Sequence, residues 1–170
     1  MISIARLNAL SDAEFVALLG GIYEHSDWVP ARVLKQRPFP AAENLRLALR
    51  AAVEGSSDGE KLALILAHPD LAGKLARSGA LTEASTREQA GLGLDRLDDA
   101  QYEAFSERNR RYREKFEFPF IICARLTTKA GVLEAFDRRL GNSRDEEIEA
   151  ALVQIHEIAR LRLADLIGDA

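Results

Sequence analysis

Residues 148–166, with the sequence IEAALVQIHEIARLRLADL, decide the fold class. Apolar side chains recur there every three or four positions, which is the spacing that places them on one face of an α-helix. That face carries Ile148, Leu152, Ile155, Ala159, Arg162 and Leu166. Because no glycine or proline interrupts the stretch, it predicts one long helix that packs its apolar stripe against a core.

Arg162 is the exception on this apolar stripe. A buried guanidinium without a partner is costly, so three arrangements are open: an ion pair with a carboxylate, a stem that carries the charge to solvent, or a cavity that binds an anion. The ion pair and the solvated stem are the commoner outcomes for such a residue. A neighbouring arginine, Arg160, lies on the adjacent helical face with Val153 and His156.

The same helical spacing recurs along the rest of the chain. Ser11 with Glu14, and Ser57 with Glu60, have the spacing of a capping box, which begins a helix. The further stripes are Phe15, Leu18, Leu19 and Ile22; Leu45, Ala48, Leu49 and Ala52; Tyr102, Phe105, Asn109, Tyr112 and Phe116; and Val132, Leu133, Phe136 and Leu140. Residues 118–122 (FPFII) have no second strand to pair with and are predicted to form a buried, extended connection. The sequence therefore predicts an all-α fold, with residues 1–170 forming a single compact multi-helix domain.

Composition narrows the class of partner. The chain has 170 residues, 47% of them hydrophobic, and a formal net charge of -4. This charge provides no positive field to collect nucleic acid or an anionic membrane surface, so neither partner is expected. Cys123 is the single cysteine, and neither Cys-x-x-Cys nor His-x-x-x-His occurs, so we expect no disulfide and no metal site. The first residues lack a signal-peptide pattern and the last three are no peroxisomal address, which favours a cytoplasmic protein.

His68 and Pro69 are the first candidate site residues. The helix that begins at Ser57 is expected to stop near His68, because a proline disfavours helical geometry in the residue before it. At a helix exit the helix dipole stabilises a protonated imidazole, and a purely structural histidine is the commoner outcome. An imidazole also exchanges protons near neutral pH, which makes His68 a candidate acid–base group.

Ser85, Glu88 and Gln89 form a second candidate group. The Ser-x-x-Glu spacing of Ser85 and Glu88 predicts a capping box, which is a structural feature. The three side chains, at positions i, i+3 and i+4, are also expected to project together from the first helical turn, where free backbone N–H groups favour an anion. The two interpretations are compatible.

The chain resembles one known family over nearly its whole length. The stretch from Phe15 to Pro30 is similar to the opening signature of the 2-oxo-4-hydroxy-4-carboxy-5-ureidoimidazoline (OHCU) decarboxylases. The other matching segments are His68-Pro69-Asp70-Leu71, Leu81-Thr82, Ser85, residues 88–92 (EQAGL), residues 118–124 (FPFIICA) and residues 158–163 (IARLRL). Two positions depart from the family pattern. Leu19 stands where a phenylalanine is expected before Gly20, and Glu117 stands at the glycine of a Phe-Gly-Phe-Pro-Phe run, in the turn before Pro119.

The resemblance implies an all-helical enzyme of urate degradation that converts OHCU to (S)-allantoin and needs neither cofactor nor metal. The chemistry of the substrate makes this reasonable, because the departing carboxylate is attached to a hydroxyl-bearing ring carbon beside a carbon–nitrogen double bond. That double bond accepts the electron pair left by carbon dioxide, a task that a cofactor usually performs. The resemblance also implies a homodimer.

The resemblance assigns roles to individual residues. His68 corresponds to the proton-transfer histidine of the family, and Glu88 either orients His68 or acts electrostatically on the departing carboxylate. Pro69 fixes the turn that directs the imidazole. Substrate contacts are assigned to Pro69, Ser85, Gln89, Phe120, Ile121, Ile122, Cys123, Ala124 and Arg162.

Two other functions compete with this one. A non-enzymatic helical interaction module would use a basic helix face to meet an acidic partner; the face carries Arg108, Arg110, Arg111, Arg113 and Lys115. A solvated helix face explains these charges better. A metal-dependent hydrolase fails on the spacing of its ligands.

Overall fold

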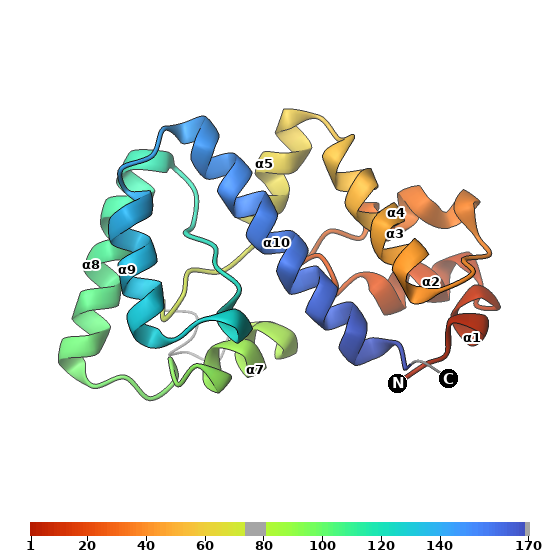
Figure 1. Cartoon of the computed structure of the whole chain (residues 1–170), viewed down its shortest axis with the longest axis horizontal. Helices are drawn as coiled ribbons and strands as arrows, with labels where there is room; N and C mark the ends of the chain where they lie inside the picture. Colours follow the sequence, from red (N-terminus) through yellow and green to blue (C-terminus); the bar gives the residue numbers. More distant parts are fainter. Residues whose placement is uncertain (74–80, 169–170) are drawn as a thin grey trace. The chain divides into compact units, whose positions relative to one another are not determined.

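The computed structural model describes residues 1–73 and 81–168, which are helical with irregular connections (Figure 1). The helices are α1 (Ile4–Asn8), α2 (Asp12–Leu19), α3 (Trp28–Val33), η1 (Leu34–Gln36), α4 (Ala42–Glu54), α5 (Asp58–Leu66), α7 (Glu83–Gly91), α8 (Asp99–Phe116), η2 (Ala124–Leu126), α9 (Lys129–Arg139) and α10 (Arg144–Leu166). The described residues contain no β-strand, only one isolated bridge between Ile2 and Ile167. The prediction of an all-α fold is confirmed.

The chain divides into two compact units. The first unit comprises Met1–Ala67 and the chain from His156 onward, and the second comprises His68–Ile155. Helix α10 therefore begins in the second unit and ends in the first. The expectation that residues 1–170 form a single domain stays a prediction.

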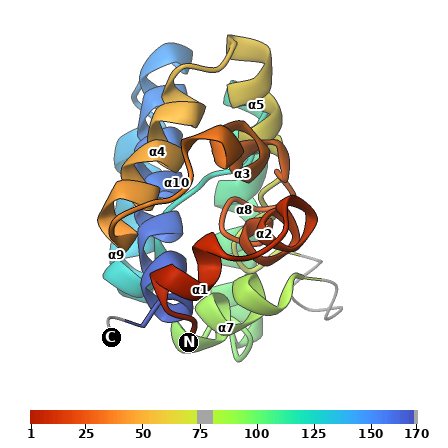
Figure 2. The ribbon, with the colours of Figure 1, turned by 90° about the vertical axis from the view of Figure 1, so that its right-hand side faces the viewer.

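In the first unit, two helices begin at capping boxes, and the segments near the two ends of the chain are joined by a backbone hydrogen bond. Ser11 and Ser57 both form the expected capping boxes, because each serine side chain accepts from the backbone N–H of the glutamate three residues on. The N–H of Ile2 donates to the carbonyl of Leu166 over 2.8 Å. Figure 2 accordingly shows α1 beside the C-terminal end of α10.

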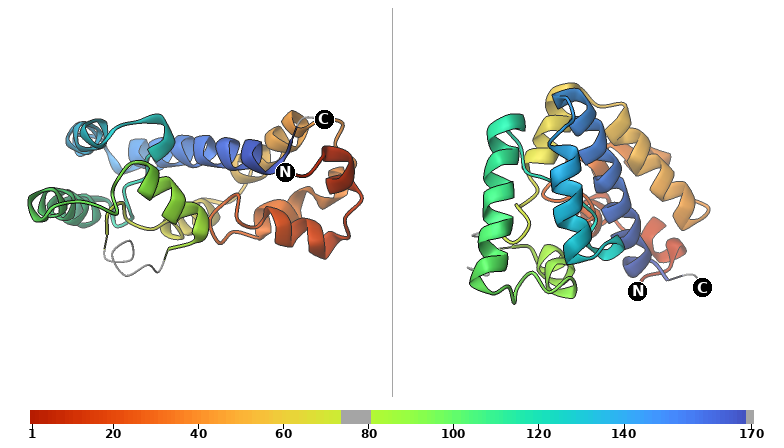
Figure 3. Two further views of the ribbon diagram at one scale, coloured as in Figure 1. Left: turned by 90° about the horizontal axis from the view of Figure 1, so that it is seen from below. Right: turned by 60° about the vertical axis from the view of Figure 1, so that its left-hand side comes forward.

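Aromatic side chains fill the core of the second unit. Helices α8 and α9 lie side by side (Figure 3, right), and the Tyr112 ring of α8 packs against four phenylalanines: Phe116, Phe118, Phe120 and Phe136. Residues 118–122 are neither helix nor strand, and all but the half-buried Ile122 are buried. The predicted buried connection is confirmed, and its phenylalanines belong to this core.

No helix in the described part of the chain has the length and apolar character needed to cross a bilayer.

Glu117 ends α8 in a conformation that normally favours glycine. Its φ angle is 66° and its ψ angle 18°, the left-handed region, and its N–H donates to the carbonyl of Arg113. Side chains raise the energy of this region, whereas glycine adopts it freely. This explains physically why a glycine was expected at this position.

Glu117→Gly is therefore expected to raise the free energy of unfolding by about 1 kcal/mol. Glu103→Gly, at an exposed position inside α8, is the matched control and is expected to lower it by about 1 kcal/mol. Urea denaturation of both variants measures the two changes. Equal destabilisation by the two substitutions would contradict the interpretation.

Candidate active site

His68 lies directly beyond the end of α5. The helix ends at Leu66, its C-cap is Ala67, and His68 begins the second unit. The predicted helix stop before Pro69 is confirmed. His68 is buried, with 6% of its surface exposed, so its imidazole is largely shielded from solvent.

The segment that follows His68 is fixed by α7 and α8. Gln89 of α7 accepts from the N–H of Ala72 through Oε1 (2.9 Å) and donates to the carbonyl of Asp70 through Nε2 (3.4 Å). Asn109 of α8 donates to the carbonyl of Leu71 over 2.8 Å. Gln89, a predicted substrate contact, thus also holds the backbone next to His68 and Pro69.

The predicted capping box at Ser85 and Glu88 is wrong. Helix α7 begins at Glu83, and its N-cap is Thr82, whose side chain accepts from the N–H of Ser85 over 3.3 Å. Both serine and threonine cap helices, and Thr82 is the one with extended backbone angles. Ser85 consequently lies inside the first turn and is buried with Gln89, whereas Glu88 is half-buried.

The segment of residues 120–124, which was predicted to bind substrate, reaches α7 at its C-terminal end. Residues 120–123 lead into η2 (Ala124–Leu126), and η2 packs against α7. Two backbone groups of this segment have side-chain partners: the carbonyl of Ile121 accepts from Arg139 Nη1 (2.7 Å), and the N–H of Cys123 donates to Gln154 Oε1 (2.9 Å). The second unit thereby links the His68 segment, α7 and residues 120–124.

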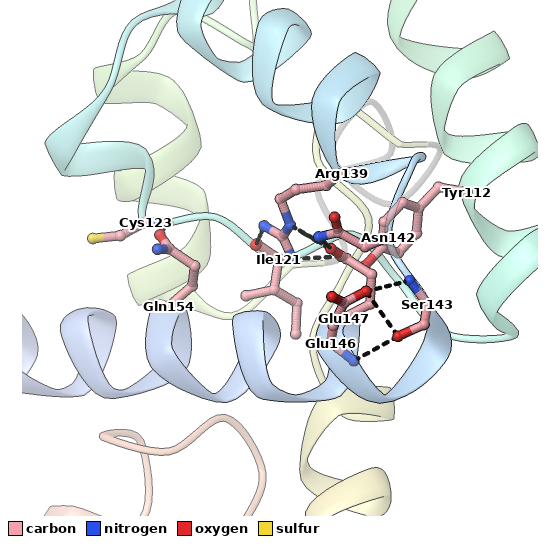
Figure 4. Close-up of polar contacts among 9 residues, drawn as sticks. All are labelled: Tyr112, Ile121, Cys123, Arg139, Asn142, Ser143, Glu146, Glu147 and Gln154. Carbon is pink, nitrogen blue, oxygen red and sulfur yellow. Dashed lines mark hydrogen bonds and ion pairs between the residues drawn. The ribbon is translucent and has the colours of Figure 1, made fainter.

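A buried polar cluster next to this segment was not predicted from the sequence. Arg139 of α9 pairs with Glu147 of α10, and their side chains are 8% and 0% exposed (Figure 4). Tyr112 and Asn142 both donate to the Glu147 carboxylate. Burial and the bond to Glu147 raise the pKa of Tyr112, which keeps its hydroxyl a donor. The only sequence signal was Glu147 beside the apolar stripe of α10.

Arg162 forms a buried ion pair in the first unit. Its Nη1 donates to Glu24 Oε2 over 2.7 Å and to the carbonyl of Gly21 over 3.0 Å, and the two side chains are 6% and 2% exposed. A carboxylate partner, one of the three open arrangements, is therefore confirmed. Glu24 itself was missed as a partner, although it lies within the opening signature of the resemblance. Arg160 pairs instead with Glu157 on the same helix, where both are substantially exposed.

His156 forms a second buried polar pair in the first unit. Its Nδ1 lies 3.1 Å from the hydroxyl of Tyr23. Burial, reinforced by the positive charge of Arg50, lowers the pKa of His156 to about 4, although Glu54 opposes this shift. Burial also raises the pKa of Tyr23. Both groups are therefore neutral in the folded protein near neutral pH.

This pair predicts a loss of stability in mild acid. An unfolded histidine titrates near 6.5, so between pH 4 and 6.5 the unfolded state binds more protons and the free energy of unfolding falls as the pH falls. The loss should reach about 3 kcal/mol by pH 4. Urea denaturation at several pH values measures how the free energy of unfolding depends on pH. This dependence should be weaker in His156→Gln than in the parent, and the exposed His25→Gln is the matched control. Identical slopes for His156→Gln and the parent would refute the assignment.

The basic face of α8 is largely engaged within the protein. Arg108 pairs with Asp137, Arg110 with Glu107 and Glu114, and Arg113 with Asp70. Lys115 donates to the carbonyls of Leu140 and Asn142. These contacts support the solvated-face interpretation over docking of an acidic partner. In the ranges 1–73 and 81–168, no cluster of three or more histidine, cysteine, aspartate or glutamate residues could hold a metal.

Comparison with known proteins identifies the family. The OHCU decarboxylase family profile matches residues 8–164. The OHCU decarboxylase of Haloferax volcanii is 40% identical over 164 residues, covering 96% of this chain and 95% of that protein. The OHCU decarboxylase of Mus musculus is 36% identical over 165 residues, covering 97% and 93%.

Solved structures give the same result. A crystal structure of (S)-allantoin synthase has a TM-score of 0.80 and 33% identity over 99% of this chain, which spans about half (54%) of that longer chain. An OHCU decarboxylase crystal structure with a TM-score of 0.69 is 23% identical and supports the fold alone. The class is thus that of an all-helical carboxy-lyase. More specifically, the chain belongs to the OHCU decarboxylase family.

Proposed function

We propose that this chain decarboxylates OHCU to (S)-allantoin in urate degradation, without a cofactor. The observation that carries the proposal is the family match over residues 8–164, together with relatives of nearly equal length that are named for this reaction. A longer relative from Bacillus subtilis, of which the chain covers 33%, is named a uric acid degradation bifunctional protein. That name supports the pathway.

The reaction needs proton transfer and orientation more than an electron sink. When carbon dioxide leaves, its bonding pair moves toward the neighbouring carbon–nitrogen double bond, and the substrate hydroxyl loses its proton as a carbonyl forms. One proton is then delivered to the ring carbon that becomes the stereocentre of allantoin, and one to the ring nitrogen that received the electron pair. A protein that places one acid–base group beside a fixed substrate can therefore catalyse the reaction.

His68 is the proposed acid–base group. It either removes the hydroxyl proton or delivers the proton to the product carbon, and the buried setting beyond α5 supports a fixed ring orientation. Glu88 orients His68 or acts on the departing carboxylate, and Pro69 fixes the turn. Ser85 and Gln89, buried on α7, hydrogen-bond the polar edges of the substrate.

Substrate binding is completed by one backbone segment and one arginine. The backbone of residues 120–124 binds the ureido and ring groups, and the packing of η2 on α7 supports this assignment. Arg162 binds an anionic group of the substrate while its Nη1 remains paired with Glu24. The Glu24 contact supports a fixed guanidinium, because the carboxylate restricts its rotation.

The proposal includes a cytoplasmic homodimer. Light scattering at micromolar concentration is expected to give twice the mass of the 18.8 kDa chain. Monomer alone at that concentration would overturn this part of the proposal.

One experiment tests the function directly. Purified protein, treated with a chelator, is mixed with freshly prepared OHCU, and the appearance of chiral allantoin is followed by circular dichroism. Formation of (S)-allantoin faster than the spontaneous background is the expected result, and it would exclude both the interaction module and the metal-dependent hydrolase. No acceleration over background would refute the proposed function.

A further inference from the structure

The backbone segment 120–123 is irregular yet mostly buried, so its polar groups need partners within the protein. Two of them are bound by side chains, the carbonyl of Ile121 by Arg139 and the N–H of Cys123 by Gln154. Between these two points, neither the N–H nor the carbonyl of Ile122 hydrogen-bonds to another part of the chain that the structure describes. The two peptide groups on either side of Ile122 are thus each held by one side chain, while the N–H and the carbonyl of Ile122 itself have no hydrogen-bond partner among the described residues.

Arg139 is itself fixed from three directions. Its Nε donates to both carboxylate oxygens of Glu147, over 3.2 and 3.0 Å, while Nη1 reaches the Ile121 carbonyl over 2.7 Å (Figure 4). The guanidinium carbon lies 4.4 Å from the centroid of the Phe120 ring. A planar guanidinium can serve a carboxylate and a carbonyl at once, whereas the single ammonium of a lysine cannot reproduce that geometry.

Two further side chains hold Glu147, and neither of them hydrogen-bonds to the backbone of residues 120–123. Tyr112 donates to Oε2, and Asn142 donates to Oε1 over 2.7 Å. A buried ion pair alone is a poor source of stability, because well-packed apolar residues often replace one without loss. The contact with the Ile121 carbonyl does something that the ion pair does not, because it satisfies a buried backbone group and ties Arg139 to the 120–123 segment.

We infer that Arg139, held by Glu147, is a positioning residue that sets the orientation of the peptide groups from Phe120 to Cys123 for substrate binding. This inference rests on the proposed function, because it assigns these groups to the substrate. Arg139 acts through the backbone and touches no reacting atom. Displacement of bound groups by about 1 Å is enough to reduce catalysis on the order of 10²-fold.

Arg139→Lys tests the inference, with Tyr112→Phe as the matched control. Arg139→Lys keeps the positive charge beside Glu147 but loses the forked contact with Ile121. We expect kcat/KM to fall by about 10- to 100-fold, mainly through KM, together with a lower enantiomeric excess of allantoin. Tyr112→Phe removes one bond to Glu147 and leaves the contact between Arg139 and Ile121, so kcat/KM should stay within about threefold of the parent. Equal kinetic losses in the two variants would overturn the inference, because a purely structural cluster predicts equality.

A measurement without substrate separates this inference from the proposed function. Amide hydrogen exchange at residues 120–123 is expected to accelerate by roughly tenfold or more in Arg139→Lys and to remain near the parent value in Tyr112→Phe. An inactive parent protein would refute the proposed function, whereas an active parent with unchanged exchange and unchanged kinetics in Arg139→Lys would refute the positioning role alone.

A double variant covers the case in which Arg139→Lys does not fold. Arg139→Met/Glu147→Leu removes both charges and leaves no buried ion unpaired, so it is expected to fold. It should show the same rise in KM and the same loss of enantiomeric excess. Parent-like kinetics in this folded double variant would overturn the inference.

Discussion

His68→Asn is expected to lower turnover of OHCU by about 10²-fold or more while the helical content and the melting temperature stay near those of the parent. The asparagine amide has a similar size and hydrogen-bonding capacity but does not exchange a proton near neutral pH. Because His68 is buried at 6% exposure, an isosteric polar replacement is preferable to a truncation that would leave a cavity.

The measurement must follow stereochemistry as well as rate, because OHCU also decays spontaneously. Circular dichroism of the product gives the enantiomeric excess, and thermal unfolding gives the stability. A structural histidine predicts the reverse pattern, with a loss of about 0.3 to 1 kcal/mol and nearly intact turnover. Optically pure product at the parent rate would remove His68 from the mechanism. His25→Asn, at an exposed histidine, is the matched control.

Arg162→Ala is expected to reduce both substrate binding and folding stability. Loss of a desolvated contact with the substrate anion should weaken transition-state binding by about 2 to 5 kcal/mol. The ion pair with Glu24 adds a second effect, because the remaining carboxylate is left buried at 2% exposure. Removal of one partner of a buried ion pair costs about 3 to 5 kcal/mol of unfolding free energy.

Two further variants separate these effects. Glu24→Gln/Arg162→Met removes both charges and should recover most of the stability while kcat/KM stays low. Arg160→Ala removes only an exposed pair with Glu157, so its stability and kinetics should stay near those of the parent. Parent-like kinetics in the folded double variant, alongside an impaired Arg160→Ala, would show that the anion is bound by Arg160.

The helices were predictable because their signals are local. Capping residues and apolar spacing act within a few positions, so Ser11 and Ser57 identified their helix starts correctly. The same rule failed at Ser85, where Thr82 offered an equally good cap three residues earlier. When two residues near a helix start can both act as the N-cap, the local sequence does not determine which of them does.

Partners across long sequence separations were not predictable. The stripe in α10 implied that Arg162 needs a partner, but nothing in the spacing designates Glu24, which lies 138 residues away. Arg139 and Glu147 are separated by only eight positions, yet they occupy different helices whose packing the spacing does not define. Both ion pairs follow from tertiary structure, and the sequence indicates only that buried charges require compensation.

The division into two units gives the protein an internal spectroscopic reporter. Trp28 is the only tryptophan of the sequence and lies in the first unit, on α3, with the Arg32 guanidinium 4.5 Å from its ring. Its fluorescence therefore follows unfolding of that unit, whereas far-ultraviolet circular dichroism follows helices in both. Coincident denaturation curves from the two signals would mean cooperative two-state unfolding, and separated curves would mean that the units unfold in sequence.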